Sequence, residues 1–311
     1  GLVLLVETQQ DAQAPQKASS ARQNQSEKAA VQTAPDAQTV RLLDGGAVTA
    51  LSMEDYLTGV LLSEMPADFE TEARKAQAVA ARTFTCRKLL QPKHENADVC
   101  AEASCCQAWT SREQLRQKYG ASFDAVWSAA REAVRQTAGE VLTYDGQLID
   151  AVYFSCSGGA TEAAVAVWGT DVPYLQAVES PGEEAAPRFS SRAVFSPEEF
   201  SQRLMQENPD VQLSGSPDAW LGETTRSAGG GAATCSIGGV SFSGTQLRRM
   251  FGLNSTRLTL SYQDGDFVFD VTGFGHRVGM SQYGAQTMAQ LGFSYQTILQ
   301  YYYQGAEVER Q

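Results

Sequence analysis

Basic charge is scarce in this chain. Its 311 residues include 24 Lys and Arg against 36 Asp and Glu, which gives a formal net charge of -12 and a pI of about 4.7. A surface that binds nucleic acid needs an excess of Lys and Arg. The composition therefore argues against a nucleic-acid partner, and it is compatible with a neutral or cationic substrate such as a glycan.

Histidine is scarcer still, with 2 in the whole chain. His94 belongs to a group of cysteines, so His276 is the one histidine left for other chemistry. The chain also has no Gly-x-Ser-x-Gly pattern, the usual surrounding of a hydrolase serine. A serine hydrolase is therefore disfavoured.

A long apolar run is missing as well. Residues 1–6, Gly-Leu-Val-Leu-Leu-Val, are too short to span a bilayer. Residues 7–38 are rich in Gln, Ala, Ser and Asp without apolar periodicity, which predicts a disordered linker. An apolar end followed by a polar spacer is the layout of a membrane-tethered extracytoplasmic protein. We therefore expect residues 1–38 to be the end of an N-terminal, single-pass anchor and a linker, although an accidentally apolar terminus is the alternative.

Residues 52–65 form the most informative stretch, because they read as one amphipathic helix. Ser52 is a good N-cap, Asp55 completes a capping-box pattern, and Pro66 ends the helix. Glu64 falls on the apolar side in the last turn. Burial and the helix dipole both raise the pKa of a carboxyl placed there, so it could act as a general acid. A Glu that reaches solvent at a frayed helix end, or pairs with an Arg, is the alternative.

A second helix is expected over residues 69–90. Its stripe of small residues permits close packing against the first helix, and Arg82 falls among apolar neighbours rather than in a run of surface charge. A tight connection after Pro66 would fold the two helices back on each other and could bring Arg82 towards Glu64.

A Cys3His set lies within residues 94–106. One imidazole and three thiols are a usual tetrahedral zinc complement, although the spacing is not that of a standard finger. One or two disulfides are the alternative, because an extracytoplasmic location permits oxidation. We expect a structural zinc rather than a catalytic one, since four protein ligands leave no open position. The expected ligands are His94, Cys100, Cys105 and Cys106.

A glycine-containing loop follows the expected strand at residues 147–154, which an Asp-Gly turn joins to a preceding strand. Glycines after a strand let a ligand approach the backbone, and hydroxyls and amides could bind sugar oxygens. A plain turn is the alternative. The candidate contacts are Ser155, Ser157, Gly158 and Gly159.

The most specific stretch is at residues 273–285, Gly-Phe-Gly-His-Arg-Val-Gly-Met-Ser-Gln-Tyr-Gly-Ala. Ser281 can cap the helix that follows. A lone histidine is more often structural than functional, but His276 stands inside this motif and could orient substrate or assist proton transfer. Before this stretch, strands at residues 258–262 and 267–271 are expected to pair.

These motifs resemble the stage II sporulation protein D family, also called the SpoIID/LytB domain, over residues 39–311. The family has a Glu-Met-Pro motif, an Ala-Arg-Thr element, a Ser-x-Ser/Cys-Gly-Gly-x-Thr loop and a Gly-His-Gly-Val-Gly-Met-Ser-Gln-Tyr-Gly-Ala stretch. This chain departs from the pattern at Gln176, where members often have Lys, and at Arg277, where they have Gly. Arg277 would narrow a groove or add a contact if that Gly lets a glycan pass closely. The matching elements here are Glu64-Met65-Pro66, Ala81-Arg82-Thr83, Ser155–Thr161, Val167-Trp168-Gly169, Pro173-Tyr174-Leu175 and Gly275–Ala285.

The resemblance implies a peptidoglycan lytic transglycosylase with Glu64 as the acid/base and Arg82 assisting it. It places His276, Ser281, Gln282 and Tyr283 with the loop residues at the substrate. Members prefer glycan strands stripped of stem peptides and work beside a cell-wall amidase and other engulfment proteins during sporulation. Some clostridial relatives carry a zinc-binding His/Cys group in the segment where this chain has its own.

One marked carboxyl is sufficient for such a reaction, whereas hydrolytic glycosidases usually need two. The expected fold is α+β, a single catalytic domain of two lobes with helices, mostly antiparallel sheets and a groove between the lobes. Two alternatives remain open at this point: a non-catalytic module that binds glycan or activates an amidase, and a vegetative relative that remodels the wall outside sporulation.

Overall fold

The computed structural model describes residues 39–311, and the expected anchor and linker at residues 1–38 lie outside them. The described chain is an α+β protein, as expected, and its strands pair antiparallel except β1 with β3 and β6 with β15. Two compact units divide it: residues up to 152 with residues 288–311 form unit 1, and residues 153–287 form unit 2. None of the helices in residues 39–311 is long and apolar enough to cross a membrane.

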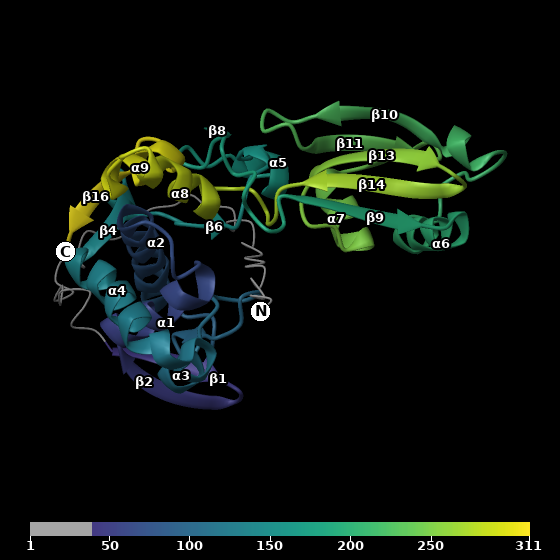
Figure 1. Ribbon diagram of the computed structural model, residues 1–311. Helices are drawn as coiled ribbons and strands as arrows, with labels where there is room; N and C mark the ends of the chain where they lie inside the picture. Colours follow the sequence, from purple (N-terminus) through teal and green to yellow (C-terminus); the bar gives the residue numbers. More distant parts are fainter. Residues whose placement is uncertain (1–38) are drawn as a thin grey trace, which may run out of the picture. The chain divides into compact units, whose positions relative to one another are not determined.

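Unit 1 is built around two consecutive helices (Figure 1). Ser52 caps the first, α1, by accepting a hydrogen bond from the Asp55 amide, as the sequence predicts. The second, α2, packs on α1, α4, α9 and β4, and its small residues are buried where the helices meet. The elements of unit 1 are β1 (Thr39–Asp44), β2 (Ala47–Ser52), α1 (Met53–Glu64), α2 (Thr71–Leu90), β3 (Val99–Cys100), α3 (Arg112–Tyr119), α4 (Phe123–Gln136), β4 (Glu140–Tyr144), β5 (Gln147–Leu148), α9 (Tyr295–Tyr302) and β16 (Glu307–Arg310).

Unit 2 contains a three-stranded sheet, β13-β14-β9, beside a second one, β10-β11-β12 (Figure 1). The expected pairing of residues 258–262 with 267–271 is confirmed in β13 and β14. Phenylalanines form much of the core under these sheets; the Phe200 and Phe267 rings stack with centroids 3.8 Å apart. The elements are β6 (Tyr153–Phe154), β7 (Gly159–Ala160), α5 (Ala164–Trp168), β8 (Glu179–Ser180), β9 (Ser190–Phe195), α6 (Pro197–Glu207), β10 (Leu221–Arg226), β11 (Ala232–Ile237), β12 (Val240–Phe242), α7 (Gly244–Phe251), β13 (Arg257–Gln263), β14 (Asp266–Thr272), β15 (Met280–Ser281) and α8 (Gln282–Gln290), which runs past residue 287.

The single strand expected over residues 147–154 is wrong. The chain turns after Asp150, whose carbonyl accepts a hydrogen bond from the Val152 amide. Residues 147–148 pair with β4, whereas β6 pairs in parallel with β15 from the other end of the chain. Apolar residues lie on both sides of the turn, and Asp150 is the one polar residue between them.

Candidate active site and metal cluster

Glu64 is the last residue of α1, and it is 3% exposed, as the apolar pattern predicts. The backbone leaves the helix at Met65, which is extended with φ -119° and precedes Pro66. The Ala108 amide donates a hydrogen bond of 2.8 Å to Glu64 Oε1. A segment far along the chain therefore holds a buried carboxyl at the C-terminal end of a helix, where the dipole disfavours negative charge.

That segment, residues 106–110, is anchored on α1 and α2. Gln107 Oε1 accepts hydrogen bonds from the hydroxyls of Tyr56, at 3.2 Å, and Thr85, at 3.1 Å. Farther along, the Trp109 indole lies so close to Gly59 that a Cβ there would be 2.3 Å from Nε1. Gln107 and Trp109 therefore fix the position of Ala108 between them, and the Ala108 amide in turn fixes the Glu64 carboxyl.

The four predicted metal ligands come together at the start of this segment. One ligand atom from each lies within 4.8 Å of all the others, and His94 Nε2 is 3.5 Å from Cys106 Sγ and 3.7 Å from Cys105 Sγ. Thiolates bound to one tetrahedral zinc at about 2.3 Å are separated by comparable distances. The structure has no disulfide between any of the six cysteines, all of which lie within residues 39–311. The donor set and its spacing fit a zinc ion held by His94, Cys100, Cys105 and Cys106.

Tyr56 links the carboxyl to the cysteine cluster. Burial, first, and then the nearby Cys106 thiol and Glu64 carboxyl raise the pKa of Tyr56 well above 10. The phenol therefore stays neutral and donates to Gln107. Glu64 and Cys106 thus both lie within electrostatic reach of one buried hydroxyl.

Arg82 is buried, and its guanidinium reaches the end of α4. It donates to the Val134 carbonyl at 2.9 Å, to Thr137 Oγ1 at 3.3 Å and to the Glu140 carbonyl at 3.3 Å. The last carbonyls of a helix have no partner within the helix, so these bonds tie α4 and the start of β4 to α2. They give Arg82 a positioning role in unit 1, and its assistance to Glu64 in the reaction stays a prediction.

In unit 2, a carboxylate that the sequence did not single out organises the predicted substrate loop. Glu183 is 1% exposed. Its Oε2 accepts from the Ser157 amide at 2.5 Å, Ser157 Oγ at 2.8 Å and the Gly158 amide at 3.1 Å, and its Oε1 accepts from Ser180 and Ser281. The Ser157 and Ser281 hydroxyls therefore donate inward, and their contact with substrate stays a prediction. No sequence motif marks Glu183, because its partners lie up to 98 residues away.

Other residues of the Ser155–Thr161 loop and of the Gly275–Ala285 stretch bring segments of the main chain into contact with each other. Gly158 has φ +77°, and a Cβ there would lie 3.0 Å from the Gly273 nitrogen, so glycine is required by a neighbouring strand end. The Tyr283 amide donates to the Ser155 carbonyl at 3.0 Å. Gln282 is buried in the first turn of α8, and Ser281 accepts from the Gly284 amide, as expected for a cap.

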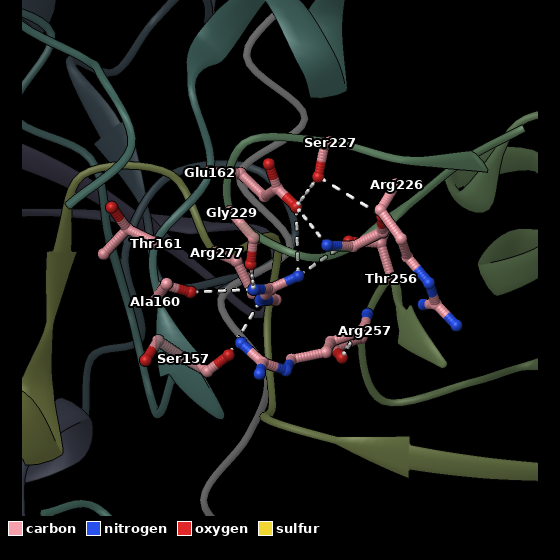
Figure 2. A network of polar contacts seen from close by, with 12 residues as sticks. Ser157, Ala160, Thr161, Glu162, Arg226, Ser227, Gly229, Thr256, Arg257 and Arg277 are labelled. Atoms are coloured by element: carbon pink, nitrogen blue, oxygen red, sulfur yellow. Dashed lines mark hydrogen bonds and ion pairs between the residues drawn. The ribbon is translucent and has the colours of Figure 1, made fainter. Parts of the chain in front are cut away.

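Arg277 differs from its expected role, because its side chain is fully buried and lines no groove. Its φ is +67°, which suits the glycine that the family pattern has there. Nη1 donates to Glu162 Oε1 at 3.1 Å, and the other nitrogens reach main-chain oxygens (Figure 2). Burial lowers the pKa of Arg277 to about 10, against the opposing effect of Glu162, and the group keeps its proton at neutral pH. The main-chain acceptors are Ser157 at 2.8 Å, Ala160 at 2.7 Å and Gly229 at 2.6 Å.

His276 is buried and neutral. Burial, with a smaller contribution from Arg248, lowers its pKa to about 3. Nδ1 accepts from the Val278 amide at 3.1 Å, so the proton is on Nε2, which has no hydrogen-bond partner among residues 39–311. The Trp168 ring, half-exposed, lies 5.5 Å from the imidazole. A neutral donor beside an accessible indole is compatible with the expected contact to a sugar.

Gln176 forms hydrogen bonds within its own loop. Its Nε2 donates to Asp171 Oδ1 at 3.0 Å and to the Val172 carbonyl at 2.9 Å. These local bonds occupy the amide where family members often have Lys.

Fold and site together define an α+β protein with a buried helix-end carboxyl, an adjoining Cys3His cluster and a serine- and glycine-rich loop held by buried carboxylates. The family model described as stage II sporulation protein, SpoIID, matches residues 44–144. Stage II sporulation protein D of Bacillus subtilis is 36% identical over 303 residues, covering 91% of this chain and 85% of that protein. The chain belongs to the stage II sporulation protein D family.

Two further relatives are similar over most of this chain. Stage II sporulation protein D of Bacillus amyloliquefaciens is 37% identical, with 84% of this chain and 75% of that protein covered. The amidase enhancer of Bacillus subtilis is 30% identical over 80% of this chain, which is 39% of that protein. The similarity thus extends from stage II sporulation proteins to a protein named for its effect on an amidase.

Proposed function

We propose that the protein is a peptidoglycan lytic transglycosylase and that Glu64 is its single acid/base. Membership of the family supports a sporulation-related role at the cell wall. The observation that carries the finer proposal is the Glu64 carboxyl, buried at the end of α1 and held by the Ala108 amide. Burial and fixed geometry are what a general acid requires.

In the proposed reaction, Glu64 gives its proton to the glycosidic oxygen between N-acetylmuramic acid and N-acetylglucosamine, and the bond from that oxygen to the anomeric carbon breaks. The resulting carboxylate then takes the proton of the 6-hydroxyl of the same muramic acid, and that oxygen bonds to the anomeric carbon. The product is a 1,6-anhydromuramic acid end. No water enters, so no second carboxylate is needed to activate one.

The proposed metal is a structural zinc held by His94 and the three clustered cysteines. Burial raises the pKa of Cys106 to about 12, so a bound cation would be what stabilises its thiolate. Four protein ligands leave no position for substrate. The ion would fix Cys106 and thereby the Ala108 amide that holds Glu64.

The proposed substrate is a glycan strand stripped of stem peptides, and the proposed setting is extracytoplasmic, with the chain tethered to the cell membrane through its N-terminal segment. A cell-wall amidase and other engulfment proteins are the proposed partners. The relative named amidase enhancer supports this choice. It also favours a second candidate function, a non-catalytic module that binds glycan or stimulates an amidase.

Mass spectrometry of products from peptide-free glycan strands tests the proposal. The wild type should generate anhydromuramic ends without a partner, and Glu64→Gln should not, while Glu113→Gln, on the exposed surface of α3, serves as the matched control. Reducing muramic ends would mean hydrolysis instead. A folded wild type that leaves the strands intact but accelerates an added amidase would favour the second candidate.

A further inference from the structure

Unit 2 contains a pocket of about 750 Å³ along the sheet formed by β9, β14 and β13. Its volume is in the range of small-molecule sites. Three arginines line it in a chain of net charge -12, together with the carboxylate of Asp270 and the hydroxyls of Ser190 and Thr272. A gathering of basic side chains in an acidic protein calls for a physical account.

Two of the three arginines are paired within the protein. Arg192 lies 3.7 Å from Asp270 through its Nε, and its Nη2 donates to Gln263 at 3.0 Å. Arg226 donates to the Leu258 carbonyl at 2.6 Å. The contact with Asp270 offsets the charge of Arg192, and the hydrogen bond to Leu258 fixes the position of Arg226.

Arg257 is different. Its backbone amide donates to Ser255 Oγ at 3.0 Å, but its guanidinium has neither a hydrogen-bond acceptor nor a carboxylate partner among residues 39–311. The group is nevertheless only partly exposed. A half-buried cation without an internal counter-charge is costly, and an external anion would lower that cost.

Two glycines hold the Arg257 guanidinium in place. A Cβ on Gly159 would lie 3.5 Å from Nη1, and a Cβ on Gly230 would lie 3.3 Å from it. Both glycines have positive φ, +117° and +76°. The guanidinium therefore lies directly against the main chain of two loops, which fixes its position before any ligand arrives.

The buried Glu162 carboxylate is already paired with another arginine. Glu162 Oε1 accepts from Arg277, Ser227 and the Gly231 amide, and Arg257 lies beside this network (Figure 2). The positive charge of Arg257 also lowers the pKa of Arg277, so the two cations repel each other. An anion at Arg257 would offset this repulsion.

We propose that Arg257 binds a carboxylate of peptidoglycan in this pocket, an inference that rests on the proposed glycan substrate. N-acetylated sugars are neutral, and a peptide-free strand carries its negative charge on the lactyl carboxylate of each muramic acid. A guanidinium binds a carboxylate through two parallel hydrogen bonds. The hydroxyls of Ser190 and Thr272 in the same pocket offer partners for sugar oxygens. The carboxylates of the stem peptide have the same chemistry and are the other source.

Binding is best measured on the full chain carrying Glu64→Gln, so that strands are not cleaved, by fluorescence anisotropy with three labelled probes. These are peptide-free strands, the same strands with every carboxylate converted to a methylamide, and peptide-bearing strands. Arg257→Gln should weaken binding of the peptide-free strands about tenfold, or about 1.4 kcal/mol. The methylamide strands should bind the parent and Arg257→Gln with equal affinity. That affinity should be about tenfold lower than the affinity of the parent for the peptide-free strands with free carboxylates. Arg249→Gln removes the same charge from an exposed site on α7, outside the pocket, and should change nothing.

Equal affinity of Arg257→Gln and its parent for both charged probes would overturn the proposal, as would methylamide strands that bind the parent as well as the acid strands do. The second comparison leaves the protein unaltered, so misfolding cannot imitate it. An Arg257 effect confined to peptide-bearing strands would assign the carboxylate to the stem peptide. Arg257-dependent binding by a wild type that forms no anhydro ends would refute the proposed catalysis and retain the carboxylate site.

Discussion

Three buried glutamates, one in unit 1 and two in unit 2, have different surroundings. Glu64 in unit 1 is 3% exposed, and Glu162 and Glu183 in unit 2 are 2% and 1% exposed. Glu162 is paired with Arg277, and Glu183 accepts from donors on three separate segments. Glu64 instead stands at the C-terminal end of a helix, with the Ala108 amide on one oxygen. Burial is common to all three, and the position at the C-terminal end of a helix distinguishes Glu64.

These surroundings bear on what each carboxylate does. A charge neutralised by a buried guanidinium or by many donors joins loops that would otherwise separate, and it has little capacity left for a reaction. A carboxyl at the unfavourable end of a helix dipole is favoured in its protonated form, which is the form that a general acid needs. The comparison therefore supports the proposed role of Glu64 as the acid/base and gives Glu162 and Glu183 structural roles, and four changes can break or sharpen it.

The largest effect on stability should come from Arg277→Met. The change leaves the buried Glu162 without its cation, and it leaves three main-chain carbonyl oxygens without the hydrogen bonds from Arg277. We expect a loss of about 3–5 kcal/mol in the free energy of unfolding. Urea denaturation of the variant and wild type measures it. The double change Arg277→Met with Glu162→Gln should recover part of the loss, and a single variant within about 1 kcal/mol of wild type would contradict the structural role.

The next effect should come from Glu183→Gln. The glutamine side chain has an NH2 group in place of one carboxylate oxygen, and this group would face N–H and O–H donors instead of accepting their hydrogen bonds. The change should cost about 2–3 kcal/mol in the free energy of unfolding. Glu184→Gln, one residue along and exposed, is the matched control and should stay within about 0.5 kcal/mol of wild type. Equal stability of the two variants would show that Glu183 does not hold the loop in place.

Removal of the proposed metal should slow cleavage about 10- to 100-fold, the usual cost of disturbing the shell around a metal or its supported group. Cys106→Ala should do the same, because the segment that carries Ala108 loses its anchor. Zinc content and the rate of anhydro-end formation are the measurements. Cys235→Ala changes a buried cysteine of unit 2 and should leave both unaltered; full activity of the zinc-free chain would show that the cluster does not support Glu64.

The last effect depends on pH and is small near neutrality. The folded-state pKa of His276, about 3, lies below its ordinary value of 6.5, so the unfolded chain binds the extra proton between these values. Stability conferred by His276 is therefore present above about pH 6.5 and falls by at most about 1.4 kcal/mol per pH unit as the pH decreases towards 3. Urea midpoints of His276→Gln should fall less steeply than wild type between pH 6 and 4. Parallel curves would mean that the imidazole is protonated in the folded state.

Local features were predictable from the sequence, and long-range ones were not. The cap at Ser52, the end of α1 before Pro66 and the burial of Glu64 all follow from residues within one helix. The Cys3His set was also visible, because its members lie close together along the chain.

The contacts of Arg277 were out of reach, because its acceptors Ser157 and Gly229 lie 120 and 48 residues away. The same holds for β6, whose partner strand β15 belongs to the C-terminal motif. Family resemblance marked residue 277 as a departure, but whether its side chain enters a groove or the interior depends on which loops meet there.

The central claim is that Glu64 alone of the buried carboxylates does the chemistry. The most direct test compares Glu64→Gln with Glu183→Gln on peptide-free strands and counts anhydromuramic ends per mole of folded protein by mass spectrometry. The account predicts a loss of about a hundredfold or more for Glu64→Gln and a rate within about tenfold of wild type for folded Glu183→Gln. Wild-type production of anhydro ends by Glu64→Gln, or its disappearance in folded Glu183→Gln, would contradict the claim.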